Sequence, residues 1–232
     1  MAWSHGSRFE LGRRLVAENT VGRLLDYGCG DGTFVAMVHD QFSEARGVDV
    51  DPEQIAGCRT RLGDLPGVSF GQTRDLGPAD AAAWTVVTCM EVLEHCLEAE
   101  RRRVIQELGR LCAAGGRIII SVPIETGPGL IAKQSFRALA GLRRLGDYAH
   151  RERYSAAEML RAAAGARVPR VVYKGESAAG AFEYYGHKGF EWRDVEREIQ
   201  ARLVIERRTF SPLPWAASLL NSQVWFICHP HS

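Results

Sequence analysis

The chain has 232 residues, which is long enough for one well-buried α/β domain and short for two. Its net charge is +1 with 25% charged residues, so no global field draws it toward nucleic acid or a membrane, although a local basic patch is compatible with these values. Because no run approaches the roughly 18 apolar residues of a membrane span, and the N-terminus lacks the apolar core of a signal peptide, we expect a cytoplasmic protein without a membrane partner. The six cysteines form no C-x-x-C pair and are expected to be reduced core residues.

The first informative segment is a glycine-rich turn near the N-terminus. An amphipathic helix is expected over residues 7–17, and a short apolar run then ends at Asp26. Glycines follow at 28, 30 and 32, and Thr33 to Val38 is compatible with a helix. This order predicts the first strand, turn and helix of an α/β nucleotide-binding unit, in which glycines let the backbone approach a ligand closely.

A second strand is expected over residues 45–50, and its end carries Asp49, placed to accept hydrogen bonds from both hydroxyls of a ribose. The Asp51-Pro52-Glu53 run is typical of a helix start, so a helix is predicted to about Leu62. A third strand is predicted over 68–72.

The next segments continue this alternation. Residues 84–90 form a continuous β-rich apolar run typical of a central parallel strand. Residues 98–111 predict an amphipathic helix ended by Gly115-Gly116, and 117–122 predict another buried strand. Alternating strands and helices indicate a doubly wound, mostly parallel α/β sheet.

After Pro123 the alternation stops. The expected elements are a helix over 130–144, a second helix opened by the capping box Ser155-x-x-Glu158, and a short strand at 170–174. A helix over 192–202 and strands over 203–210 and 223–228 complete the chain. The predicted organisation is a single domain with an N-terminal helix (1–20), a cofactor-binding core (21–123), an inserted helical cap that binds the substrate (124–187) and a C-terminal helix with the last two strands (188–232).

Four motifs in this order resemble class I S-adenosylmethionine-dependent methyltransferases. They are the Asp-x-Gly-x-Gly-x-Gly run from Asp26, Asp49, the segment from Val86 to His95, and the run from Leu111 to Arg117. The resemblance implies a Rossmann-like, seven-stranded sheet and S-adenosylmethionine as cofactor. The alternative, a dinucleotide dehydrogenase, requires G-x-G-x-x-G, whereas Thr33 stands where that pattern has its third glycine.

Carried over by position, the resemblance places Asp26, Gly28 and Gly30 along the methionine part, Asp49 at the ribose and Val50 at the adenine face. Relatives have an acidic residue near the adenine amine, and Asp75 is the nearest counterpart here. The full set of predicted cofactor residues is Asp26, Gly28, Cys29, Gly30, Asp49, Val50, Asp75, Met90 and Glu91.

The segment Glu91-Val92-Leu93-Glu94-His95 allows two interpretations. If the turn is helical, Glu91, Glu94 and His95 share one face and offer oxygen and nitrogen ligands to a divalent metal. This E-x-x-E-H run resembles the metal site of small-RNA 2′-O-methyltransferases, in which a further histidine, here His187, completes the set. The same run is common in small-molecule O-methyltransferases. The simpler interpretation, which the sequence favours, is an acid near a helix start beside a hydrogen-bonded histidine.

We therefore expect methyl transfer to a small-molecule acceptor, most simply at a hydroxyl, in bacterial biosynthetic or cell-surface metabolism. His187 is the leading candidate for a general base and His95 the second. Two alternatives stay open, namely a metal-dependent RNA 2′-O-methyltransferase and a non-catalytic cofactor-binding protein. Side chains in and beside the insert that could bind acidic groups of the acceptor are Lys133, Arg137, Arg151, Arg153, Tyr154 and Lys188.

Overall fold

A computed structural model describes residues 3–18, 22–131, 134, 154–177 and 180–231. Its strands are β1 (Arg23–Tyr27), β2 (Glu44–Asp49), β3 (Val68–Gln72), β4 (Trp84–Met90), β5 (Cys112–Pro123), β6 (Val172–Ser177), β7 (Gly180–Tyr185), β8 (Leu203–Ser211) and β9 (Gln223–Pro230). Its helices are α1 (Trp3–Ala17), α2 (Thr33–Val38), α3 (Pro52–Leu62), α4 (Glu98–Leu111), α6 (Ala156–Ala163) and α7 (Trp192–Gln200), with short 3-10 turns η1 (His39–Gln41), η2 (Thr73–Asp75), η3 (Pro78–Asp80) and η4 (Pro214–Ala216).

The main sheet has seven strands in the order β3-β2-β1-β4-β5-β9-β8. The neighbours among β1 to β5 pair in parallel, whereas β9 runs antiparallel to both β5 and β8. Parallel strands bring their carboxyl ends to one edge, where ligands bind in open α/β sheets. The predicted doubly wound, mostly parallel α/β fold is confirmed.

Local signals explain why these elements form where they do. The Asp51 side chain accepts a hydrogen bond from the Glu53 backbone N–H at 2.9 Å, so it caps α3, whose first position is Pro52. Most side chains of β4 are buried, which is what a central strand covered on both faces requires.

Two apolar clusters cover the two faces of the sheet. One packs α4 and α7 against the sheet through residues such as Ile105 and Val195. The other packs α1, α2 and α3 against the opposite face through residues such as Val16 and Val35. Leu24 and Leu25, adjacent in β1, point into different clusters because successive side chains of a strand alternate between faces.

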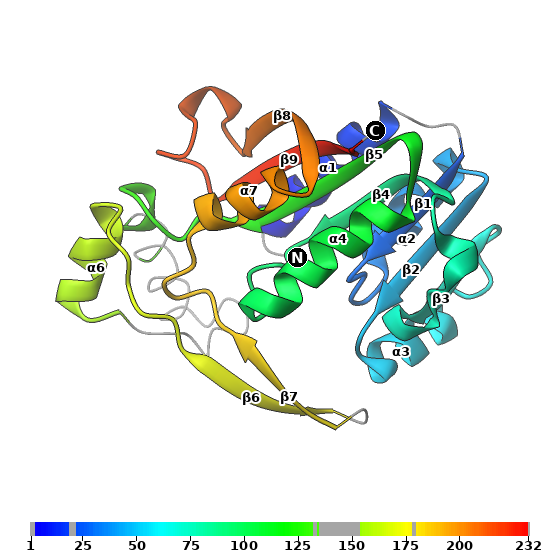
Figure 1. Cartoon of the computed structure of the whole chain (residues 1–232), viewed down its shortest axis with the longest axis horizontal. Helices are drawn as coiled ribbons and strands as arrows, with labels where there is room; N and C mark the ends of the chain where they lie inside the picture. Colours follow the sequence, from blue (N-terminus) through cyan, green and yellow to red (C-terminus); the bar gives the residue numbers. More distant parts are fainter. Residues whose placement is uncertain (1–2, 19–21, 132–133, 135–153, 178–179, 232) are drawn as a thin grey trace.

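The described part of the insert follows β5, with α6 on the left of Figure 1 and β6 and β7 at the bottom. Its described part contains α6 and a two-stranded antiparallel sheet, β6 with β7, that extends away from the main sheet. The capping box of α6 is present, with the Ser155 Oγ accepting from the Glu158 N–H at 3.2 Å.

Three local predictions need comment. The strand expected at 170–174 is shifted to β6, and its partner β7 was not predicted. Gly115 and Gly116 do not end α4, which stops at Leu111; they lie inside the first part of β5, where Gly115 has φ 72°. The helix expected over 130–144 falls largely outside the described residues.

Within the described ranges, no helix has both the length and the apolar character needed to cross a membrane.

Candidate active site

A hollow of about 240 Å³ lies beside the glycine-rich turn at the carboxyl edge of the sheet. Six of the predicted cofactor residues line it: Asp26, Gly28, Cys29, Gly30, Met90 and Glu91. Three lining residues were not predicted, namely Phe9, Asp31 and Phe34. The rings of Phe9 and Phe34 stack with centroids 6.0 Å apart, so α1 contributes one wall, as a helix that closes over a cofactor would.

Asp26 is the buried acid of this hollow, with 2% of its surface exposed. Its Oδ1 accepts a hydrogen bond from the Thr88 hydroxyl at 2.6 Å. Burial raises the pKa of Asp26 to about 7, with a further contribution from the Asp49 carboxylate, while the Thr88 hydrogen bond acts in the opposite direction. A cationic ligand placed here stabilises the ionised form of Asp26.

The turn itself depends on Gly28 and Asp49. Gly28 has φ 83°, and a Cβ there would lie 2.3 Å from Val92 Cγ2, so only glycine allows this close approach. The Asp49 carboxylate accepts hydrogen bonds from the Gly30 N–H at 2.9 Å and the Asp51 N–H at 3.0 Å. Asp49 therefore ties the end of β2 to the glycine turn and keeps lone pairs for other donors.

Like Asp49, two further predicted cofactor residues, Val50 and Asp75, are not among the residues that line the hollow. Val50, with 66% of its surface exposed, follows Asp49 at the edge of the sheet. Asp75 lies in η2, and its Oδ2 accepts from the Gln72 N–H at 2.7 Å. Cys29 is buried, and burial raises the pKa of its thiol, so its chemistry is that of a small packed residue.

The segment after β4 forms a turn rather than the helix that the metal interpretation assumed. Glu91 has φ 58° and its N–H donates to the Ser121 carbonyl at 3.0 Å, while the His95 N–H donates to the Val92 carbonyl at 3.0 Å. As a result, Glu91 lines the hollow, whereas Glu94 and His95 lie in a second group of side chains.

That second group unites Glu94, His95 and His187. One potential ligand atom from each lies within 4.8 Å of the others, and Glu94 is fully buried. The two imidazoles meet edge to face with centroids 4.9 Å apart. His187 follows β7, far along the chain from Glu94, so the fold brings together three of the four predicted candidate metal ligands; Glu91 lies outside this set.

Two hydrogen bonds fix His95 against the end of β7. Its Nδ1 lies 2.9 Å from the Tyr185 carbonyl oxygen, and its own carbonyl accepts from the Tyr185 N–H at 2.9 Å. Because a carbonyl only accepts, Nδ1 carries the proton, and Nε2 of the neutral ring presents a lone pair. That Nε2 lies 4.0 Å from Glu94 Oε1.

Arg170 connects the same two segments a second time. Its Nη2 donates to the carbonyl oxygens of Glu94 and, at 2.9 Å, Gly186. Its guanidinium stacks on Tyr185 at 4.0 Å and on Phe190 at 5.1 Å from the ring centroids. Arg170, which the sequence did not indicate, therefore holds the turn after β4 against the turn after β7, the two segments that contain the cluster.

Glu125 is a further residue that the sequence reasoning missed. It follows β5, is fully buried, and its Oε1 lies 3.8 Å from His187 Nδ1. The available signal was its position, since a charged residue directly after the long buried run of β5 falls at the ligand-binding edge of the sheet.

Of the predicted acceptor-binding side chains, Lys133, Arg137, Arg151 and Arg153 lie outside the described residues. The Lys188 ammonium lies 2.8 Å from Glu158 Oε1 and 5.5 Å from the centroid of the Tyr154 ring. Hydrogen bonding to Lys188 lowers the pKa of Glu158 to about 2. In this structure Lys188 joins α6 to the His187 turn.

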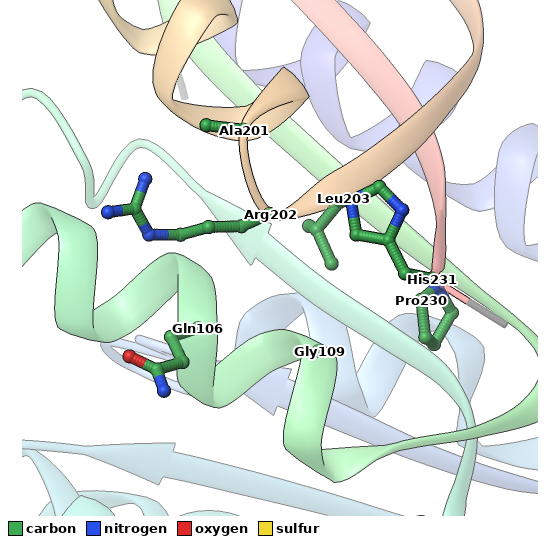
Figure 2. Close-up of a pocket in the computed structure, with 7 residues that line it drawn as sticks. All are labelled: Gln106, Gly109, Ala201, Arg202, Leu203, Pro230 and His231. Atoms are coloured by element: carbon green, nitrogen blue, oxygen red, sulfur yellow. The ribbon is translucent and has the colours of Figure 1, made fainter.

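A larger hollow of about 500 Å³ lies elsewhere, between α4, the start of β8 and the end of β9 (Figure 2). Its lining residues are Gln106, Gly109, Ala201, Arg202, Leu203, Pro230 and His231. Because α4 starts near the carboxyl edge and runs back across the sheet, this hollow is remote from the glycine turn, and we assign it no role in the site.

Comparison with known proteins gives a consistent result. The model of a family described as a methyltransferase domain matches residues 7–167. The ubiquinone biosynthesis O-methyltransferase of Cronobacter sakazakii is 31% identical over 103 residues, which is 43% of this chain and 41% of that enzyme. The match therefore spans less than half of that relative's length.

Solved structures show the same fold. A protein of Pyrococcus horikoshii OT3 matches 99% of this chain and 92% of its own with a TM-score of 0.63 at 16% identity. The N-methyltransferase NodS of Bradyrhizobium japonicum, solved with S-adenosyl-L-homocysteine, matches 97% of this chain and 88% of its own with a TM-score of 0.54 at 14% identity. At these identities the likeness shows the fold alone.

Proposed function

Because the chain belongs to the methyltransferase domain family, we propose that it methylates a hydroxyl group of a small molecule and binds a divalent cation at Glu94, His95 and His187. The family match confirms the broader prediction of an S-adenosylmethionine-dependent methyltransferase, and the solved structures confirm its fold. The cation and the acceptor are the parts that we propose.

The observation that carries the proposal is the convergence of one carboxylate and two imidazoles within 4.8 Å. Such a mixed oxygen and nitrogen donor set suits divalent first-row metals. The fixed tautomer of His95, with Nδ1–H donated to the Tyr185 carbonyl, is the arrangement typical of a metal-binding histidine. This geometry changes our preference, since the sequence alone favoured a simple hydrogen-bonded histidine.

The position of the cluster fits methyl transfer to oxygen. Glu91 lines the hollow of the glycine turn, and Glu94 begins the cluster three positions later, so donor and acceptor would meet across this turn. The acceptor oxygen attacks the methyl carbon, the electron pair of the breaking C–S bond goes to sulfur to leave S-adenosylhomocysteine, and the proton of the hydroxyl group goes to solvent water. A bound cation supplies Lewis acidity that lowers the pKa of a hydroxyl. The chain's own side chains align the two reactants.

The name of the relatives and the near-neutral net charge of the chain support a small-molecule hydroxyl as the acceptor. Methylation of an RNA 2′-hydroxyl requires the same chemistry. RNA is therefore the alternative acceptor that the experiment compares with small molecules. The prediction that His187 or His95 is instead a general base is the competing assignment for the same side chains. A cytoplasmic location stays a prediction.

Calorimetry with Mn²⁺, in the presence of S-adenosylhomocysteine, tests the cation. We expect wild-type binding, its loss in Glu94→Gln, and unchanged binding in the control Glu98→Gln, whose side chain is 66% exposed. Chelation should abolish methyl transfer from labelled cofactor. Full activity after chelation, with loss of activity in His187→Ala, would support the general-base assignment instead. Labelled transfer to RNA but not to hydroxyl-bearing small molecules would contradict the proposed acceptor.

A further inference from the structure

Glu125 occupies a rigid position at the carboxyl edge of the sheet. The Ile124 N–H beside it donates to the Ser222 carbonyl at 2.8 Å, and the Gly127 N–H donates to the Ala162 carbonyl at 2.8 Å. These bonds tie the segment both to the chain entering β9 and to α6. The Glu125 side chain is fully buried, so its orientation is set by the surrounding protein.

The carboxylate faces the imidazole of His187. Glu125 Oε1 lies 3.8 Å from His187 Nδ1, and the same imidazole packs edge to face on His95. A distance of 3.8 Å exceeds a hydrogen bond, but hydrogen bonds of an active site are often long before its ligands bind.

We propose that Glu125 is a positioning residue that accepts a hydrogen bond from His187 Nδ1–H and thereby directs the Nε2 lone pair of His187 toward the cation. The inference rests on the proposed function, because it assumes a cation at Glu94, His95 and His187. It goes beyond that function by assigning a role to a buried carboxylate outside the cluster of three.

The two histidines of the cluster are then oriented by different acceptors. The Nδ1 of His95 lies 2.9 Å from a neutral carbonyl, that of Tyr185, whereas the Nδ1 of His187 faces a carboxylate. A carboxylate partner fixes the tautomer and raises the basicity of the imidazole, and removing such a partner typically lowers metal affinity by about 10- to 100-fold. Glu125 should therefore determine how tightly the cation is bound.

Mn²⁺ calorimetry on Glu125→Gln and Glu125→Asp tests this role. Loss of the charge in Glu125→Gln should weaken Mn²⁺ binding by about 10- to 100-fold, and Glu125→Asp, which keeps the charge, should bind with intermediate affinity. The control Glu98→Gln removes a carboxylate whose side chain is 66% exposed and should bind Mn²⁺ like the wild type. S-adenosylhomocysteine affinity should be the same in all four proteins, which shows that the core is intact.

A second readout separates positioning from a purely structural role. Because the defect is one of cation affinity, raising Mn²⁺ should restore turnover of Glu125→Gln while the KM for S-adenosylmethionine stays constant. Equal Mn²⁺ affinity in Glu125→Gln and wild type overturns this inference alone. A loss of S-adenosylhomocysteine binding in both variants also overturns it, because it assigns Glu125 to folding. A wild-type protein that binds no Mn²⁺ overturns the proposed cation site and this inference together.

Discussion

The hollow at the glycine turn and the cluster of Glu94, His95 and His187 are built in opposite ways. The hollow is made mostly of residues that lie in or near the turns after β1 and β4, so short sequence patterns determine it. The cluster requires a turn after β4 and a second turn after β7, joined by contacts of Tyr185 and Arg170. Under the proposed function, the hollow is the cofactor half of the site and the cluster its acceptor half. The cofactor half would then depend on local backbone geometry, and the acceptor half on contacts between distant segments.

The largest effect is expected from a substitution that impairs cofactor binding and leaves the cluster of Glu94, His95 and His187 unchanged. Asp49→Ala removes the carboxylate that accepts from the Gly30 and Asp51 N–H groups and that is expected to bind the ribose. Loss of two charge-assisted hydrogen bonds predicts a decrease of about 100-fold or more in S-adenosylhomocysteine affinity by calorimetry. Asp64→Ala, at an exposed loop position, is the control and should bind normally. Unchanged affinity in Asp49→Ala would remove Asp49 from the cofactor site.

The second substitution should impair Mn²⁺ binding at the cluster and leave cofactor binding unchanged. Arg170→Gln loses the stacking on Tyr185 and Phe190 and weakens the link between the Glu94 and Gly186 carbonyls. We expect a decrease of about 10- to 100-fold in Mn²⁺ affinity with normal S-adenosylhomocysteine binding. The control, Arg167→Gln, removes an arginine that is 75% exposed and should behave like the wild type. A parallel loss of both affinities would show that the two halves are not separable.

A smaller effect concerns the acid inside the cofactor hollow. Burial raises the pKa of Asp26 to about 7, so in the unliganded fold this group's contribution to stability falls as the pH rises from about 4 to 7. The ammonium group of the homocysteine part favours the ionised form of Asp26, which predicts that S-adenosylhomocysteine affinity rises by up to about 10-fold from pH 6 to pH 8, with proton release on binding. Calorimetry in buffers of different ionisation enthalpy measures both. Asp26→Asn should abolish the pH dependence, and its persistence would assign it to another group.

The smallest effect is expected from a substitution in the insert, which should lower stability without changing cofactor or Mn²⁺ affinity. Ser155→Ala removes the N-cap of α6 and should lower the free energy of unfolding by about 1 kcal/mol. Denaturant unfolding measures this loss, while S-adenosylhomocysteine and Mn²⁺ affinities should stay at wild-type values. A change in Mn²⁺ affinity would mean that α6 supports the cluster through Lys188 or Glu125.

The sequence predicted most of the core because its signals are local. The cap at Asp51, the apolar run of β4 and the amphipathic pattern of α4 each determine an element from a few neighbouring residues. β7 escaped prediction because its side chains are exposed or half-buried, so no alternation of apolar and polar residues marks it. The partners of Glu125 and Arg170 follow from the path of the insert, which no short pattern encodes.

The turn after β4 also sets the distance between the hollow at the glycine turn and the cluster of Glu94, His95 and His187. Glu91 is anchored by the Ser121 carbonyl and has a positive φ, and Val92 packs against the face of Gly28 that lacks a Cβ. Under the proposed function, the span from Glu91 to Glu94 would be a spacer of constant length between the methyl donor and the acceptor. An insertion or deletion there would change the donor-to-acceptor distance for every acceptor alike. New acceptor preferences should therefore arise in the 124–187 insert, where length can vary without moving the cofactor.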